Sequence, residues 1–126
     1  MFASGEVYHC EVTDTFRLER GQIIRDRETE FWRDLLHPVV VDTGTGMVRM
    51  GPDGTPLRWG ILQQGAGEWD FVAVQPAYGD AVLSTIRIRV WEDPVQIVVA
   101  VNGFMFAAGI CKPLNENPLI APENAL

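Results

Sequence analysis

Several patterns that mark common classes of protein are missing from this sequence of 126 residues. No run of about 18 apolar residues occurs, so we expect no membrane insertion. Serine occurs only as Ser4 and Ser84, and neither lies in the turn sequence that presents a serine nucleophile. No glycine-rich stretch has the spacing of a phosphate-binding or dinucleotide-binding loop. The sequence therefore argues against a serine hydrolase and against a nucleotide cofactor.

Metal ligands and basic residues are also scarce. The only histidines are His9 and His37, and His9 points to the opposite face of its predicted strand from its neighbour Cys10. We therefore expect no metal site and no cofactor. Acidic residues outnumber basic ones by 17 to 10, which gives a net charge of −7. Because this charge repels phosphate backbones, we expect no direct binding of nucleic acid.

The first residues give an expectation about the compartment. The segment from Met1 to Gly5 lacks the basic and apolar regions of a signal peptide. We therefore expect either a cytoplasmic protein or a periplasmic or exported protein whose sequence starts at the mature end.

The dominant pattern is the alternation of apolar and polar residues that is typical of half-buried β-strands. It predicts strands over residues 6–18, 39–41, 47–50, 57–64, 69–74, 82–91, 95–101 and 104–111, separated by turns rich in glycine and proline. In the first strand Tyr8, Cys10 and Val12 share a face, and we expect Phe16 and Leu18 to resume the alternation. Seven or eight such strands predict an all-β, mainly antiparallel fold, as a small meander barrel or a two-sheet sandwich.

One segment has a helical period instead. Between Asp26 and Leu36, two pairs of apolar residues that begin at Phe31 and Trp32 are spaced four residues apart. Asp26 is a suitable helix cap, and Pro38 prevents the helix from continuing. The sequence therefore predicts one short helix in the β domain.

The chain ends and the cysteines define the expected domain. After Lys112 the composition shifts and no strand or helix period remains, so we expect a single β domain over residues 1–112 and an irregular tail over residues 113–126. Closure of a barrel would place the first and last strands side by side. Cys10 and Cys111 could then form a disulfide. In a reducing cytosol the alternative is two buried free thiols.

Four short motifs, in a fixed order, resemble a known family. They are Tyr8-His-Cys10-Glu-Val12-Thr-Asp14, Val41-Asp-Thr-Gly-Thr-Gly-Met47, Gly65-Ala-Gly-Glu-Trp69-Asp-Phe71 and Gly109-Ile-Cys111-Lys112. Over residues 7–112 the chain is similar to small exported proteins predicted in proteobacterial genomes, in which an early and a terminal cysteine frame a β domain. The resemblance implies this fold and these framing cysteines. The family has no assigned activity, so the resemblance implies no catalytic residue.

One motif points to an enzyme. The apolar run before Asp42-Thr43-Gly44 is how an aspartic protease presents a catalytic carboxylate, and such an enzyme needs two carboxylates that share one proton. A chain this short would need a homodimer, as in retroviral-type proteases. The alternative is a glycine-rich turn over residues 42–46. The supporting segment of the protease is poorly imitated by residues 100–103, because Asn102-Gly103 is a preferred hairpin turn.

The strongest candidate contact surface lies on the predicted strand 82–91. Arg87, Arg89 and Trp91 alternate with apolar residues and share one face, and arginine and tryptophan are enriched at binding hot spots. Glu68 and Asp70 flank a tryptophan, and we expect them to form a solvated charged face. We therefore predict a noncatalytic domain that binds a protein or a small apolar ligand through Arg87, Arg89 and Trp91. A second noncatalytic hypothesis is a small acidic inhibitor of a nucleic-acid enzyme, in which carboxylates stand in for phosphates.

Overall fold

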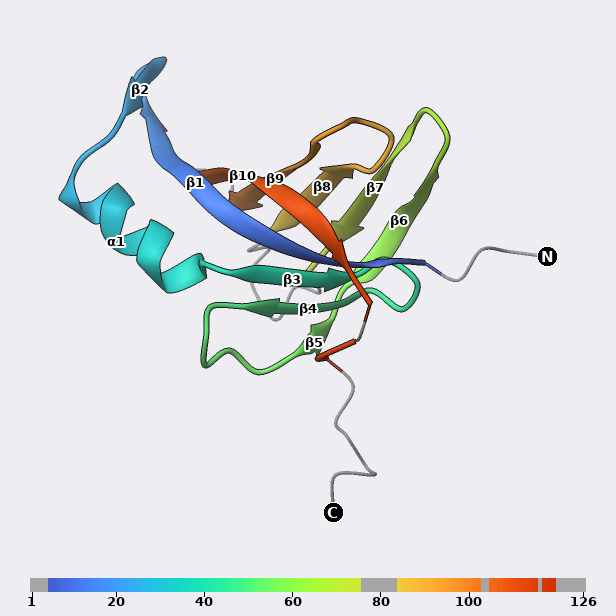
Figure 1. Ribbon diagram of the computed structural model, residues 1–126. Coiled ribbons are helices and arrows are strands. Elements are labelled where there is room, and N and C mark those ends of the chain that lie inside the picture. The colour runs from blue at the N-terminus through green and yellow to red at the C-terminus, as the bar shows by residue number, and fades with distance from the viewer. Residues whose placement is uncertain (1–4, 76–83, 103–104, 116, 120–126) are drawn as a thin grey trace.

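The computed structural model describes residues 5–75, 84–102, 105–115 and 117–119 (Figure 1). These residues form ten strands and one helix: β1 (Val7–Glu19), β2 (Gln22–Ile24), α1 (Arg27–Leu36), β3 (Val39–Asp42), β4 (Met47–Met50), β5 (Leu57–Arg58), β6 (Gly60–Ala66), β7 (Trp69–Val74), β8 (Thr85–Arg89), β9 (Val95–Val101) and β10 (Met105–Leu114). The predicted all-β fold with one short helix is confirmed. More strands form than expected, because β2 is too short to give a pattern and the predicted strand 57–64 divides at Trp59.

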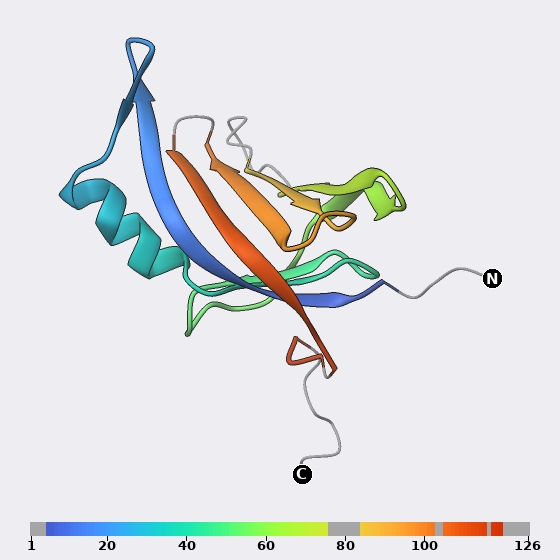
Figure 2. The ribbon, with the colours of Figure 1, turned by 45° about the horizontal axis from the view of Figure 1, so that its top comes forward.

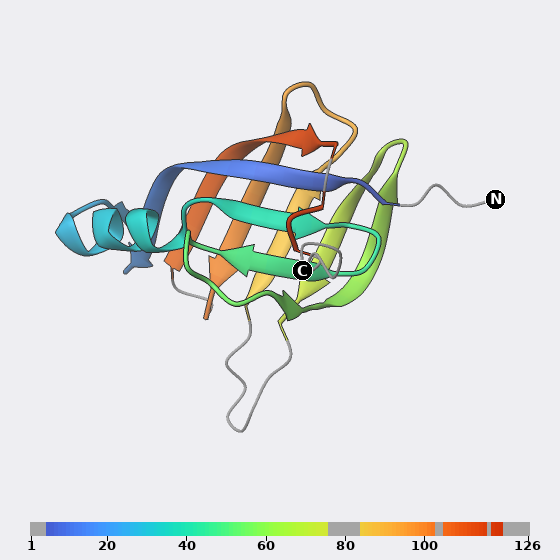
Figure 3. The same cartoon turned by 60° about the horizontal axis from the view of Figure 1, so that its bottom comes forward.

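All ten strands belong to one antiparallel sheet, in the order β5-β4-β3-β1-β10-β9-β8-β7-β6, with β2 beside β1. The two ends of this order, β5 and β6, are consecutive in the chain, so the sheet curls until its ends meet (Figure 3). Near this seam the backbone N–H of Trp59 donates to the carbonyl of Gly46 at 2.8 Å, and the Gln64 side chain donates to the carbonyl of Thr43. The fold is therefore a nearly closed barrel and not a two-sheet sandwich.

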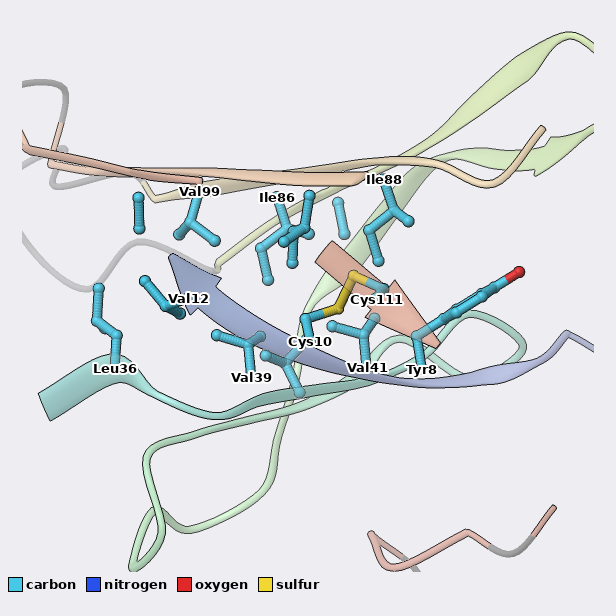
Figure 4. Packing of buried hydrophobic residues seen from close by; sticks show 14 of the residues in the cluster. Tyr8, Cys10, Val12, Leu36, Val39, Val41, Ile86, Ile88, Val99 and Cys111 are labelled. Carbon is cyan, nitrogen blue, oxygen red and sulfur yellow. A yellow bond between two sulfur atoms is a disulfide. The ribbon is translucent and has the colours of Figure 1, made fainter. Parts of the chain in front are cut away.

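The inward side chains form one apolar core (Figure 4). The alternation predicted for the strand around β8 is confirmed, since Ile86 and Ile88 are fully buried and Arg87 between them is exposed. Phe71 of β7 and Met105 of β10 are also fully buried. Burial of this apolar surface is the main source of stability in a domain of this size.

The first and last strands lie side by side in the middle of the sheet. Cys10 of β1 lies directly opposite Cys111 of β10, and the two form a disulfide with their Cα atoms 3.9 Å apart (Figure 4). The prediction that barrel closure brings these cysteines within bridging distance is confirmed. Both sulfur atoms face the core, where Cys10 also lies opposite Val39 of β3.

A bulge in β1 changes which residues face the core. The register against β10 shifts after Val12, and beyond the shift Thr15 is buried. Phe16 lies on the other face, where its ring stacks on that of Phe106 with the ring centroids 5.4 Å apart, and Leu18 is exposed. The expectation that Phe16 and Leu18 resume the inward alternation is wrong, because one extra residue in a strand exchanges its two faces.

The helix α1 begins and ends where the sequence predicts. The side chain of Asp26 accepts from the backbone N–H of Thr29, and the Thr29 hydroxyl accepts in return from the N–H of Asp26. The helix lies beside β1 (Figure 2), and its last residue, Leu36, belongs to the core. His37 follows the helix, and its Nδ1 accepts from the backbone N–H of Val12 at 3.0 Å.

The C-terminal end of the β domain lies further along the chain than expected. β10 continues past Lys112 to Leu114, and Leu119 is buried against Val7 and Val40 on the outside of the barrel. Part of the predicted irregular tail therefore packs on the sheet. Asn102 has a φ of 54°, as the predicted hairpin turn requires. The expected turn over residues 76–80, the first residues of the predicted strand 82–91, and positions 103 and 104 lie outside the described residues.

We expect the disulfide to contribute about 4 to 5 kcal/mol to the free energy of unfolding, because it joins residues separated by 101 positions and so restricts the unfolded chain. Urea denaturation of the oxidised and reduced protein, followed by tryptophan fluorescence, measures this difference. The double variant Cys10→Ala, Cys111→Ala is the control, since reductant should leave its stability unchanged. Equal stability of the oxidised and reduced wild-type protein would contradict the prediction.

Candidate functional site

The three residues predicted to form a contact surface lie together on the outside of the barrel. β8 directs Ile86 and Ile88 into the core, which turns Arg87 and Arg89 outward. Trp91 follows β8 and is 43% exposed. We call Arg87, Arg89 and Trp91 the Arg–Trp patch.

A buried carboxylate on the neighbouring strand holds this patch together. Asp70 of β7 is only 9% exposed. Its Oδ2 accepts from Nη1 of Arg87 at 2.7 Å, and its Oδ1 accepts from the indole N–H of Trp91 at 2.7 Å. The expectation that Glu68 and Asp70 form a solvated face is therefore wrong for Asp70, because the side chains of Arg87 and Trp91 cover its carboxylate.

The remaining patch residue is held by stacking and by a second carboxylate. The guanidinium carbon of Arg89 lies 5.1 Å from the ring centroid of Trp91, within the range of a cation–π interaction. Nη1 of Arg89 lies 3.5 Å from a carboxylate oxygen of Glu92. Each arginine of the Arg–Trp patch is thus paired with a carboxylate, Arg87 with Asp70 and Arg89 with Glu92.

The charge state of Asp70 follows from opposing effects. Burial disfavours its charged form and raises the pKa of Asp70. The hydrogen bonds from Arg87 and Trp91, together with the charges of Arg87 and Arg89, lower it by more. The net pKa of Asp70 therefore lies below the usual value for an aspartate. The carboxylate stays ionised at neutral pH and keeps the patch assembled.

Exposed aliphatic side chains extend the surface beside the patch. Arg87 lies opposite Val72 of β7 on one side and Val98 of β9 on the other, and Val98 is 46% exposed. One strand further, Ile110 of β10 lies opposite Gln96 and is 48% exposed. Directly paired residues share a face of the sheet. The outer face of β7 to β10 therefore combines aliphatic groups, an indole ring and two guanidinium groups.

Asp42, the residue of the protease hypothesis, has the environment of a turn aspartate. It ends β3 and is buried. Its Oδ1 accepts from the backbone N–H groups of Gly44 at 2.9 Å and Thr45 at 3.3 Å, and its Oδ2 accepts from the Asn117 side chain at 2.7 Å. These contacts are typical of an Asx turn and favour the structural interpretation. The homodimeric protease needs Asp42 from a second copy and stays a hypothesis.

A hollow of about 300 Å³ lies at the end of the barrel where β1 begins, and its lining includes Glu6, Tyr8, Thr43 and Gln64. Burial, with a smaller effect of the nearby Glu6 carboxylate, raises the pKa of Tyr8 to about 12. The Tyr8 hydroxyl is therefore protonated at neutral pH. Among the residues that the structure describes, no histidine, serine or cysteine lines this hollow.

Within the described ranges, no three histidine, cysteine, aspartate or glutamate side chains lie close enough together to hold a metal ion. No helix among these same residues is long and apolar enough to cross a membrane. No protein-family model, curated protein or solved structure matches the chain. Function therefore has to be inferred from the chemistry of the surface.

We expect Asp70→Asn to remove a pH-dependent part of the stability. Because the pKa of Asp70 in the fold lies below its unfolded value of about 3.9, the carboxylate stabilises the fold above that pH. This contribution is lost as the pH falls from about 4 toward the folded-state pKa. At pH 7 the substitution should cost about 1 to 3 kcal/mol, the range for a buried hydrogen-bonded charge. Thermal unfolding between pH 3 and pH 7 measures both effects.

The control for this experiment is Asp53→Asn, because Asp53 is an exposed residue between β4 and β5. It should leave the stability at neutral pH within about 0.5 kcal/mol of the wild type. If Asp70→Asn and Asp53→Asn gave the same stability at every pH, Asp70 would not hold the patch.

We expect Asp42→Asn to keep the fold, with a loss of about 1 to 2 kcal/mol for the weakened contact to Asn117. Asparagine still accepts the turn hydrogen bonds through its side-chain oxygen. Urea denaturation and a peptide-cleavage assay at acidic pH test the two hypotheses together. A wild-type cleavage activity that disappears in Asp42→Asn would support the homodimeric protease and overturn the turn interpretation.

Proposed function

We propose that this protein is a noncatalytic binding module that recognises another protein through the Arg–Trp patch and the aliphatic face beside it. One observation carries the proposal. The buried Asp70 carboxylate ties down two patch residues, yet the patch stays open to a partner, with Arg87 and Arg89 side chains 57% and 49% exposed.

This arrangement lowers the cost of binding. A long arginine side chain that becomes ordered at an interface loses about 0.5 to 1.5 kcal/mol of conformational entropy. Here Asp70 and Glu92 already order Arg87 and Arg89, and the ring of Trp91 is fixed by its indole N–H. A partner therefore meets a surface whose side chains are already in place.

The shape and chemistry of the surface favour a protein over a small apolar ligand. The inward face of the barrel is occupied by core side chains, whereas the patch lies on the outer face of β7 to β10. Tryptophan and arginine are enriched in the buried centres of protein interfaces. Val98 and Ile110 add exposed apolar area next to the patch.

The disulfide bears on the cellular compartment in which a partner would be bound. Disulfides persist in oxidising compartments and are rare in a reducing cytosol. The Cys10–Cys111 bond is therefore in keeping with the exported family that the sequence resembles. We therefore propose that the partner is met in the periplasm or outside the cell, the oxidising alternative of the two compartments that the sequence leaves open.

We expect Trp91→Ala and Arg89→Ala each to weaken the partner's affinity by about 2 kcal/mol, or roughly thirtyfold, as at a binding hot spot. A quantitative pull-down from cells that produce the protein, in buffer without reductant, compares wild-type and variant baits. Candidate partners are the proteins that the wild-type bait enriches over beads without bait, and the amount of each is then compared between the wild-type and variant baits.

Trp69→Ala is the matched control, because Trp69 is 67% exposed and lies outside the Asp70 hydrogen bonds. It should retain the partner. A partner retained equally by both tryptophan variants would refute the site. Circular dichroism of each variant shows whether the barrel is intact, and an unfolded Trp91→Ala protein would assign Trp91 to stability instead of binding.

A further inference from the structure

A second surface feature lies where the end of α1 meets the barrel. A groove of about 420 Å³ runs between the last turn of α1 and the loop that follows β4 (Figure 1). Its lining includes Leu36, which belongs to the core, and Met50, which packs against the core. The exposed residues Leu35 and Pro52 also line it. The groove therefore offers an apolar surface that is continuous with the protein interior.

A glycine holds the two sides of this groove together. The backbone N–H of Gly51 donates to the carbonyls of Leu36 and Pro38, each at 2.9 Å. Gly51 has a φ of 83°, and a Cβ atom there would lie 2.5 Å from the carbonyl oxygen of Leu35. Residues with a side chain adopt this φ only with strain. The loop is thus fixed to the end of the helix, and a ligand would meet a groove that is already formed.

The charged groups around the groove are negative. Among the described residues that line it, Asp34 and Asp53 are the charged ones, and both are exposed. Asp53 forms no ion pair with a described residue, and Asp34 has a long contact of 3.8 Å to Nε of Arg33. The carbonyl groups at the C-terminal end of a helix carry a partial negative charge, so Asp34 is unfavourable in the last turn of α1. A cation at the groove would offset this repulsion.

The exposed face of α1 repeats this combination one turn earlier. Phe31 precedes Leu35 by four residues, which places both on one side of the helix, and they are 62% and 50% exposed. Glu30 precedes Asp34 by the same interval and is also exposed. Arg27, the first residue of α1, lies two turns away from Leu35. Apolar and acidic groups therefore lie side by side along the end of the helix that forms the groove.

We propose that the groove between α1 and the loop 51–54 docks a segment of another protein in which an apolar side chain lies between basic residues. The apolar side chain contacts Leu36 and Met50, and the flanking positive charges face Asp34 and Asp53. Charge complementarity of this kind selects the partner and fixes its register. A second copy of this chain is a less suitable occupant, because a symmetric contact would bring the same carboxylates together.

The groove and the Arg–Trp patch are separate sites. Met50 of the groove pairs with Val39, the first residue of β3. Val90, which precedes Trp91 in the chain, lines the hollow at the opposite end of β3 together with Thr43. The docking proposal therefore does not depend on the function proposed for the patch, and either can fail alone.

A peptide titration followed by nuclear magnetic resonance tests the proposal. The probe is the blocked tripeptide acetyl-Arg-Leu-Arg-amide, added to the isotope-labelled protein at fixed pH and ionic strength. The backbone amide signals of Leu35, Gly51 and Gly54 should move and reach saturation. Those of Arg87 and Trp91 should stay in place, which separates docking in the groove from general attraction of a cation to an acidic protein.

Two matched peptides separate the apolar from the electrostatic contribution. Acetyl-Arg-Gly-Arg-amide keeps both charges and lacks the apolar side chain. Acetyl-Glu-Leu-Glu-amide keeps the apolar side chain and reverses both charges. Each should bind at least about fivefold more weakly than the probe, because each lacks one of the two contributions.

Variants of exposed residues locate the site. Asp34→Asn and Asp53→Asn should each weaken binding of the probe about two- to fivefold, since exposed ion pairs are weak. Leu35→Ala should weaken it about threefold through the lost apolar contact. The controls are Glu68→Gln, in the exposed turn between β6 and β7, and Leu62→Ala, on β6, where Leu62 is 67% exposed. Neither control should change the affinity.

The proposal would be overturned if the groove amide signals showed no saturable shift, or if the leucine and glycine peptides bound equally. Equal effects of Asp53→Asn and Glu68→Gln would also overturn it. Shifts of the same amide signals that grow with protein concentration in the absence of peptide would assign the groove to contact between two copies of the chain instead.

Discussion

The pairing of β1 with β10 is the constraint on which the rest of the barrel depends. Most other pairs are local, since β3 with β4, β6 with β7, and β8 with β9 are joined by short connections. The contact between β1 and β10 instead joins residues 101 positions apart, and its loop entropy is correspondingly large. The Cys10–Cys111 disulfide holds β1 and β10 together despite this entropic cost. Two meanders of local hairpins thereby become a single curved sheet.

The periodicity of the sequence predicted which residues face inward, but not how strands pair. Ile86 and Ile88 could be placed in the core because alternation reports burial directly. Phe16 was expected on the wrong face, since a bulge leaves no mark in composition and exchanges the two faces of β1, which buries Thr15 instead. Barrel and sandwich share the same alternation. The two folds differ in whether the ends of the sheet, β5 and β6, come together at Trp59, and β5 is too short to predict from the sequence.

The candidate site shows the same division between what a strand pattern reveals and what register adds. Alternation placed Arg87 and Arg89 on one outer face with Trp91. Alternation did not reveal the role of Asp70, because this carboxylate lies on the neighbouring strand β7. Its place beside Trp69 and Glu68 in the sequence suggested a solvated residue instead. The available signal was that Asp70 precedes the inward Phe71 and so must face outward, on a strand that pairs with β8. Sequence alone does not give that register.

Net charge is a poor guide to this surface, because pairing decides which charges a partner meets. The net charge of the chain is −7, yet the carboxylates of Asp70 and Glu92 are paired with Arg87 and Arg89. The aliphatic and aromatic area of this face can therefore be buried by a partner without leaving a buried charge unpaired. On β4, β1 and β10 the opposite holds: basic groups make no ion pair with described residues, and two of their nitrogen atoms are buried without partners. The outer face of β7 to β10, whose charges are paired, is the one that the proposed binding function uses.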